Sequence, residues 1–151
     1  MAKKELNKAQ EYLKQVKLLD IHINSRLEEL VQLKALATKT TSTWSAEPGG
    51  GSGNQDKMGN AVAKIVDMQR EINDAIDAFV DKKNEVRSLL EKIQDPDQLD
   101  ILFKVYFQYE TLTQAACEMG MTYRNACYIH GEALQEVVDL LETSGGSNER
   151  K

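Results

Sequence analysis

Apolar residues recur every seven positions along the first 38 residues of the chain. One row of this repeat consists of Ala9, Val16, Ile23, Leu30 and Ala37, and a second row beside it consists of Leu6, Leu13 and Leu27. A seven-residue spacing places each row along one face of an α-helix. The pattern therefore predicts one long amphipathic helix.

The same repeat returns in residues 57–94. Its unbroken row is Met58, Ile65, Ile72, Phe79, Val86 and Ile93, and the row beside it is Val62, Ile76 and Leu90. A helix of about 35 residues is about 50 Å long and cannot shield such a row by itself. We therefore expect residues 1–94 to form an antiparallel coil hairpin in which Leu30 meets Ile65 and Ile23 meets Ile72. A parallel homodimer of the first helix is the main alternative.

Residues 39–56 lie between the two repeats and show no periodicity. A Thr/Ser run is followed by the cluster "GGGSG", and glycine populates many backbone conformations, so we expect a flexible connector. The segment lacks the Gly-Lys-Ser/Thr ending and the preceding strand of a phosphate-binding loop. Further along, Asp95-Pro96 predicts the end of the second helix and the start of the next, because proline suits the first helical position.

Residues 95–142 have the spacing of a helix-turn-helix. The stretch "DQLDILFKVYF" predicts a supporting helix whose apolar face is Leu99, Leu102, Phe103 and Tyr106. In "LTQAACEMGMTYRNACYIHG", Gly120 stands where the turn needs a left-handed residue, and the hydroxyl of Thr122 can cap the following helix. The positions expected to face inward are Ala115, Ala116, Met119, Met121, Ala126 and Ile129. An αα-corner that binds no nucleic acid has the same packing needs.

Composition agrees with an all-α protein, since Leu, Ala, Glu, Lys and Gln are abundant and there are only two prolines. The N-terminal lysines precede no apolar signal core, and no run approaches the roughly 20 apolar residues that span a bilayer. We therefore expect a cytoplasmic protein without membrane contact, with a disordered tail at residues 143–151.

Cysteine and histidine do not predict a reactive centre. Cys117 and Cys127 are expected to be free thiols, and their spacing suits no common metal site. Cys127 and His130 are neighbours on one helix, but neither an orienting residue nor an oxyanion site accompanies them. We expect Cys117 to be a small core residue, His130 to lie on a helix surface, and the protein to be no enzyme, with neither cofactor nor metal.

Several stretches together resemble a known family. They are "KELNKAQEYLKQVKLLDIHINSRLEEL", the Thr/Ser and Gly-rich connector, "GNAVAKIVDMQREINDAID", "DPDQLDILFKVYF" and "EMGMTYRNACYIHGEALQE". The chain resembles the sigma-70 region-4-like transcriptional regulators of Gram-positive phages and prophages, related to the RinA/ArpU late-gene activators. The resemblance implies a helical coil followed by a sigma-like helix-turn-helix that acts on promoter DNA with host RNA polymerase. The DNA-binding residues it implies are Thr122, Tyr123, Arg124, Asn125, Cys127 and Tyr128.

Charge modifies this expectation. Residues 95–142 carry two basic and nine acidic side chains, and residues 1–94 carry 15 basic and 14 acidic ones. Because most non-specific DNA affinity comes from neutralised phosphates, the chain alone should bind DNA weakly. A phage transcription regulator that depends on polymerase, with possible homo-oligomerisation through the coil, is the leading interpretation. The alternative is a protein-interaction adaptor or inhibitor that keeps the fold without binding DNA.

Overall fold

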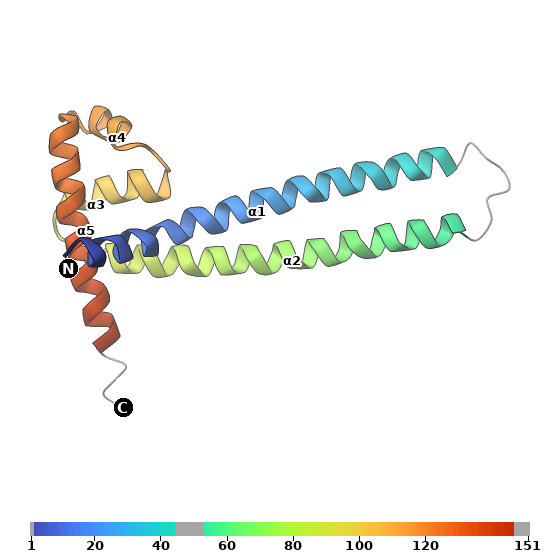
Figure 1. Cartoon of the computed structure of the whole chain (residues 1–151), viewed down its shortest axis with the longest axis horizontal. Helices are drawn as coiled ribbons and strands as arrows, with labels where there is room; N and C mark the ends of the chain where they lie inside the picture. The colour runs from blue at the N-terminus through green and yellow to red at the C-terminus, as the bar shows by residue number, and fades with distance from the viewer. Residues whose placement is uncertain (1, 45–52, 147–151) are drawn as a thin grey trace. The chain divides into compact units, whose positions relative to one another are not determined.

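The protein is all-helical in the part of the chain that its computed structural model describes, residues 2–44 and 53–146 (Figure 1). Every regular element in these ranges is a helix, which confirms the predicted all-α class. The elements are α1 (Ala2–Trp44), α2 (Gly53–Leu90), α3 (Pro96–Leu102), the π-helix η1 (Phe103–Phe107), α4 (Leu112–Glu118) and α5 (Tyr123–Gly146).

The chain divides into two compact units. We call residues 1–18 with 80–151 the terminal unit, and residues 19–79 the two-helix unit. This division differs from the predicted boundary between residues 94 and 95. The physical reason is that the first turns of α1 bury Ala9, Leu13 and Val16 almost completely in the terminal unit, so segments far apart in the sequence share one core.

The two long helices extend into the segment predicted to be a connector. Helix α1 continues to Trp44, and α2 begins at Gly53. The hydroxyl of Thr38 donates to the carbonyl oxygen of Lys34 at 2.9 Å, and such a bond to the preceding turn lets threonine remain helical. The rest of the predicted connector, residues 45–52, lies outside the described residues.

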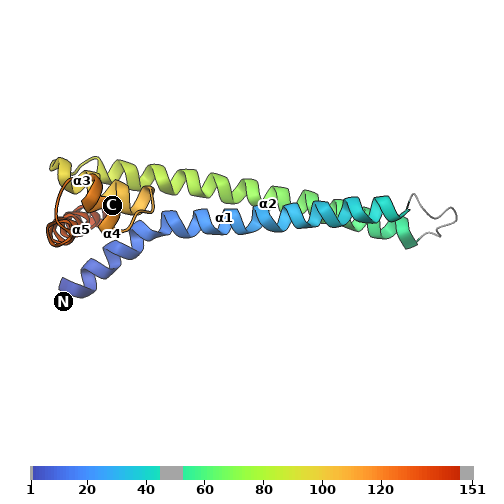
Figure 2. The same cartoon turned by 90° about the horizontal axis from the view of Figure 1, so that it is seen from above.

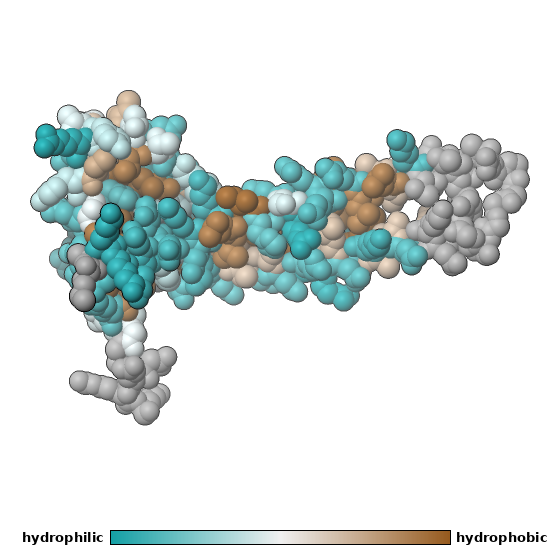
Figure 3. Space-filling view, viewed as in Figure 1, coloured by the Kyte–Doolittle hydropathy of each residue, from teal (hydrophilic) through white to brown (hydrophobic). Residues whose placement is uncertain are grey.

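In the two-helix unit, α1 and α2 lie side by side and run in opposite directions (Figures 1 and 2). The unbroken heptad rows provide the buried side chains, Ile23 and Leu30 from α1 and Ile72 from α2. The second row does not become buried here, because Leu27, Val62 and Ile76 remain exposed. Figure 3 shows hydrophobic residues at the surface along these two helices.

The terminal unit has a continuous apolar core. Its fully buried large side chains are Leu13, Val16, Val86, Leu90, Ile101, Leu102 and Val137. They come from α1, α2, α3 and α5, so the ends of both long helices support the short helices. Deleting a buried leucine side chain from such a core costs about 2–5 kcal/mol, which makes these contacts the main determinants of how the short helices are placed.

Helix α3 begins as its sequence predicts. Pro96 is its first residue, and the Asp95 carboxylate accepts hydrogen bonds from the amides of Asp97 and Gln98 at 2.9 and 3.4 Å. The predicted helix does not continue regularly to Phe107, because Phe103–Phe107 adopts π geometry. The amide of Gln108 bonds to the carbonyl of Phe103 at 3.0 Å, and Tyr109 then takes a left-handed φ of 60° that ends the helix.

Helix α5 runs four residues further than predicted, to Gly146. The hydroxyls of Thr143 and Ser144 donate to the carbonyls of Asp139 and Leu140 at 2.8 and 2.9 Å. These bonds stabilise the last turn within what the sequence suggested was a disordered tail. The remainder of that segment, residues 147–151, lies outside the described residues.

Candidate nucleic-acid interface

Three short-range features of the sequence define the start of α4, the turn after it and the start of α5. Thr111 and Gln114 form a capping box at the start of α4, with reciprocal bonds of 3.2 and 2.9 Å. After α4, Gly120 has a φ of 67°, which confirms the predicted left-handed turn residue. The hydroxyl of Thr122 accepts a hydrogen bond from the Asn125 amide at 3.2 Å, as its predicted capping role requires.

Small residues allow α4 and α5 to approach closely. Ala115, Ala116 and Ala126 are buried, as predicted for the helix crossing. The other three predicted inward residues, Met119, Met121 and Ile129, are half-buried. The α4–turn–α5 segment therefore presents the first turn of α5 at the surface of the unit.

The predicted site residues are not equally available to a ligand. Thr122, Tyr123, Arg124, Asn125 and Tyr128 are exposed, with Tyr123 and Tyr128 at 57% and 66%. Cys127 is only half-buried and sits closer to the packed side of α5 than the resemblance implies. A hydrogen bond with Cys127 raises the pKa of Tyr123, so this pair forms a contact along the flank of the helix.

Arg124 and Tyr128 share the outward face of α5 because they are four residues apart. Gly131 continues this face, and no atom lies within 4 Å of the position that a Cβ there would occupy. A hydrogen bond with Glu132 raises the pKa of Tyr128, which places an acidic side chain beside the same face. The first turn of α5 contains no carboxylate, whereas the following turns do.

One of the two cations of residues 95–142 is engaged in an ion pair. Lys104 lies 2.8 Å from the carboxylate of Glu118, and this hydrogen bond lowers the pKa of Glu118. Arg124, exposed at the start of α5, is the other cation.

Folding joins additional cations to this acidic segment. The terminal unit as a whole contains 13 basic and 15 acidic side chains, a net charge of −2, because residues 1–18, 80–94 and 143–151 belong to it together with residues 95–142. Sequence analysis assigned those lysines to a separate domain and so found no compensating charge. The difference matters because phosphate contacts depend on the charge of the whole docking unit.

Three of these cations surround two aromatic rings. The Lys17 ammonium lies 5.8 Å from the ring centre of Tyr109, and the Lys83 ammonium and Arg87 guanidinium lie 5.8 and 6.0 Å from that of Phe107. Sequence reasoning missed this cluster, because its members are separated by up to about 90 positions along the chain. Such cation–π contacts orient the cations while leaving part of each charge available to solvent.

A buried polar pair joins α5 to η1. His130 Nε2 is 2.8 Å from the Tyr106 hydroxyl oxygen, and both side chains are buried. The prediction that His130 lies on the surface is therefore wrong, whereas Tyr106 is in the core as expected. Burial, followed by repulsion from Lys14, lowers the pKa of His130, and burial raises the pKa of Tyr106 to about 12. Cys117, expected in the core, is instead exposed.

Comparison of the chain with family models, curated proteins and solved structures finds no match. Among the described residues, none of the helices has the length and apolar character needed to cross a membrane. The same ranges contain no group of three or more His, Cys, Asp or Glu side chains placed to hold a metal ion.

Proposed function

We propose that this protein is a sigma-like phage or prophage transcription regulator that binds promoter DNA through α4, the turn at Gly120 and α5. The observation that carries the proposal is the exposed, carboxylate-free first turn of α5, with Tyr123, Arg124 and Asn125 presented after a left-handed glycine and a capping threonine. A helix presented in this way fits the major groove of DNA.

The proposed architecture is an antiparallel coil hairpin followed by this helix-turn-helix. The side-by-side course of α1 and α2 and the alanine-lined contact of α4 with α5 support it. In this arrangement the coil assembles the regulator or contacts host RNA polymerase, and the terminal unit engages the promoter. The sequence resemblance to sigma-70 region-4-like regulators points the same way.

Each proposed contact has a chemical counterpart on DNA. The Arg124 guanidinium can donate two hydrogen bonds to guanine O6 and N7, and the Asn125 amide can pair with adenine. The side-chain amide of Asn125 donates a weak hydrogen bond to the sulfur of Met121 at 3.8 Å, which it can exchange for a hydrogen bond to a base at little cost. The exposed amides at the start of the 24-residue helix α5 favour a phosphate nearby.

Charge makes a polymerase partner part of the proposal. With a net charge of −2 on the terminal unit, the protein alone neutralises few phosphates. We expect a shallow salt dependence of DNA binding, with a log–log slope of about −1 to −3. Host RNA polymerase supplies the remaining DNA affinity, as the resemblance to sigma-like regulators suggests.

The test is a DNA-binding titration of the full-length protein at several salt concentrations, with and without host RNA polymerase. Binding sites are first selected from a random double-stranded pool by the protein–polymerase mixture. Arg124→Ala should weaken binding by about 1–3 kcal/mol while leaving helicity and thermal unfolding nearly unchanged. Arg70→Ala is the matched control, because it removes the same charge from an exposed site in the two-helix unit.

A protein-interaction adaptor or inhibitor that keeps this fold is the second candidate. The net negative charge of the terminal unit and the Tyr128–Glu132 contact favour this candidate, since carboxylates beside a DNA-binding helix repel the phosphates of DNA. If polymerase does not raise DNA affinity and Arg124→Ala binds like the wild type, the adaptor function replaces the promoter-binding one. Recovery of a host protein from lysate after nuclease treatment would then identify the bound partner class.

A further inference from the structure

The two-helix unit leaves an apolar surface uncovered along one flank. Its members are Leu27, Val31, Val62, Val66 and Ile76, exposed by 39%, 68%, 50%, 46% and 38%. We call this set the apolar flank. These side chains lie beside the buried row of Ile23, Leu30 and Ile72 but are not part of it.

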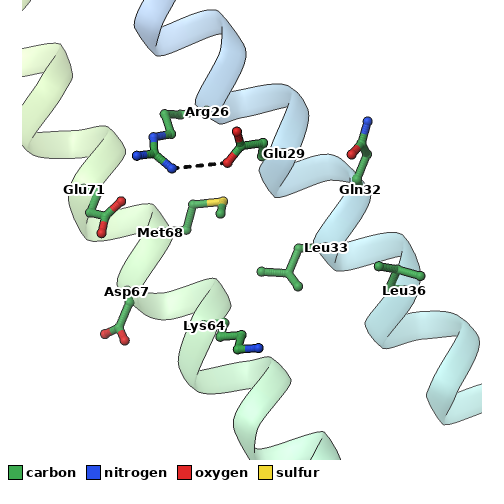
Figure 4. Close-up of a pocket in the computed structure, with 9 residues that line it drawn as sticks. All are labelled: Arg26, Glu29, Gln32, Leu33, Leu36, Lys64, Asp67, Met68 and Glu71. Carbon is green, nitrogen blue, oxygen red and sulfur yellow. Dashed lines mark hydrogen bonds and ion pairs between the residues drawn. The ribbon is translucent and has the colours of Figure 1, made fainter.

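Heptad geometry shows that both helices contribute to the same flank. With Ile23 and Ile72 at the first position of the repeat, a, the flank residues occupy positions e and b. Position e is next to a on the helix surface, and b follows e on the same side. The opposite flank consists of positions g and c. Figure 4 shows that residues at these positions from both helices come together around one pocket, among them Glu29, Lys64, Asp67 and Glu71. The e and b positions of both helices therefore lie on the other side.

The two flanks differ in their chemistry. The g and c side is charged, and its Glu29 carboxylate pairs with Arg26 at 3.2 Å (Figure 4). The polar residues interspersed in the apolar flank are the uncharged Asn24, Gln69 and Asn73. A helix of a bundle uses positions a, d and e towards its core, whereas a simple two-stranded coil uses only a and d. The apolar e positions of the flank thus have the pattern expected for a third core row in a larger bundle.

We propose that the apolar flank binds the same flank of a second copy of this chain, with the two copies antiparallel, to form a four-helix bundle. A two-fold axis across the flank places α1 on α1 of the partner and α2 on α2 of the partner. Because the flank is uncharged at its centre, like surfaces can meet without electrostatic repulsion. A partner protein of opposite charge would instead be expected at the g and c side.

Charge complementarity selects the antiparallel order. The α1 stripe of e and b positions ends in Asp20 and Lys34, which are seven residues to either side of Leu27. Centring the two-fold axis on Leu27 places Asp20 opposite Lys34 of the partner subunit. A parallel arrangement would instead place these two charges beside apolar residues of α2.

The same axis also fits α2. Figure 4 shows Glu29 of α1 beside Met68 of α2. Leu27 is two residues before Glu29, and Gln69 is one residue after Met68 on the antiparallel helix, so their levels differ by one residue of helical rise, about 1.5 Å. Val62 and Ile76 are seven residues to either side of Gln69. Centring the axis there therefore places Val62 opposite Ile76 of the partner subunit.

The size of the flank predicts a reversible dimer. The apolar flank extends about 20–27 Å along α1 and α2, at 1.5 Å per residue, and is two helices wide. Its projected area is therefore roughly 400–550 Å² on each chain. Stable interfaces bury about 800 Å² on each partner, and weaker assemblies less. The dimer should consequently dissociate on dilution and re-form on concentration.

The mass of the full-length protein, measured by sedimentation equilibrium over a wide range of concentration, tests the interface. The wild type should shift from the 17.0 kDa monomer to twice that mass. Val31→Lys should remain monomeric with unchanged helical content, because Val31 is largely exposed within the monomer. Leu36→Lys is the matched control, because Leu36 is also largely exposed but lies at position g on the opposite flank, and it should dimerise like the wild type.

The orientation is tested in a background in which both native cysteines are replaced by serine. Leu27→Cys should give a disulfide-linked dimer on mild oxidation, since the two copies of residue 27 meet at the axis. Asp20→Lys should weaken dimerisation, and adding Lys34→Asp should restore it. A monomer at every concentration, equal effects of Val31→Lys and Leu36→Lys, or a dimer without the Leu27→Cys crosslink would each overturn the proposal. DNA titrations do not enter this test, so its outcome is independent of the proposed function.

Discussion

Replacement of His130 by glutamine provides a quantitative test of the buried contact between α5 and η1. The imidazole is 9% exposed and bonds to the Tyr106 hydroxyl at 2.8 Å. A neutral imidazole suits this site, because one ring nitrogen donates and the other accepts, whereas a buried imidazolium lacks a counterion there. Burial and the nearby Lys14 accordingly lower the pKa of His130.

The sign of the pH effect follows from this lowered pKa. In the unfolded chain, histidine has a pKa of about 6.5. As pH decreases below that value, the unfolded state binds a proton that the folded state still refuses, so the free energy of unfolding decreases until the folded pKa is reached. One such group contributes a slope of at most about 1.4 kcal/mol per pH unit. Above about pH 7, the contribution of His130 is constant.

Urea unfolding at a series of pH values between about 7.5 and 5.5 measures this slope. His130→Gln should be less stable than the wild type at pH 7.5, by about 1–3 kcal/mol for the disturbed buried hydrogen bond. The variant should also lack the slope contributed by His130. His22→Gln is the control, because His22 is exposed on α1 in the two-helix unit, and it should retain the wild-type slope.

The comparison between variants removes the contribution of other titratable groups, which is the same in both proteins. Among these groups is Glu110, whose pKa is raised by desolvation and by the neighbouring Glu118. If His130→Gln keeps the full wild-type slope, or if the wild type shows none, His130 is not held neutral by its surroundings. Burial beside Tyr106 would then not lower the pKa of His130.

Three further predictions concern one helix start and two glycines, each measured by urea unfolding at neutral pH. Asp95→Ala should lower stability by about 0.5–2 kcal/mol, since the carboxylate that caps α3 is lost. Gly120→Ala should lower stability by about 1–2 kcal/mol because φ is 67° there. Gly131→Ala should raise stability by about 0.5–1 kcal/mol, because the added methyl group meets nothing within 4 Å. The same sign for both glycine variants would contradict this assignment of their backbone conformations.

Short-range physics explains which features were predictable. The helix start at Asp95-Pro96, the left-handed Gly120 and the Thr122 cap depend on groups within four residues of each other, so local sequence suffices to place them. The heptad rows likewise report which face of each long helix is apolar. They also predicted the buried positions of Ile23 and Ile72.

The candidate interface was only partly predictable for the same reason. Exposure of Tyr123, Arg124, Asn125 and Tyr128 follows from helical periodicity on either side of the buried Ala126. The half-buried state of Cys127 depends on which neighbouring elements pack along the flank of α5. That information is not contained in a stretch of 20 residues.

The sequence by itself determined the helical class, the helix starts and the apolar rows, because hydrophobic periodicity and capping are local properties of the chain. Tertiary structure alone decided that α1 shares a core with the C-terminal helices, that His130 pairs with Tyr106, and that Lys17 reaches Tyr109. These features depend on contacts between residues that are 24 to more than 90 positions apart. Only the packing of the whole chain brings such residues together, since no local pattern encodes which distant side chain will occupy a given site.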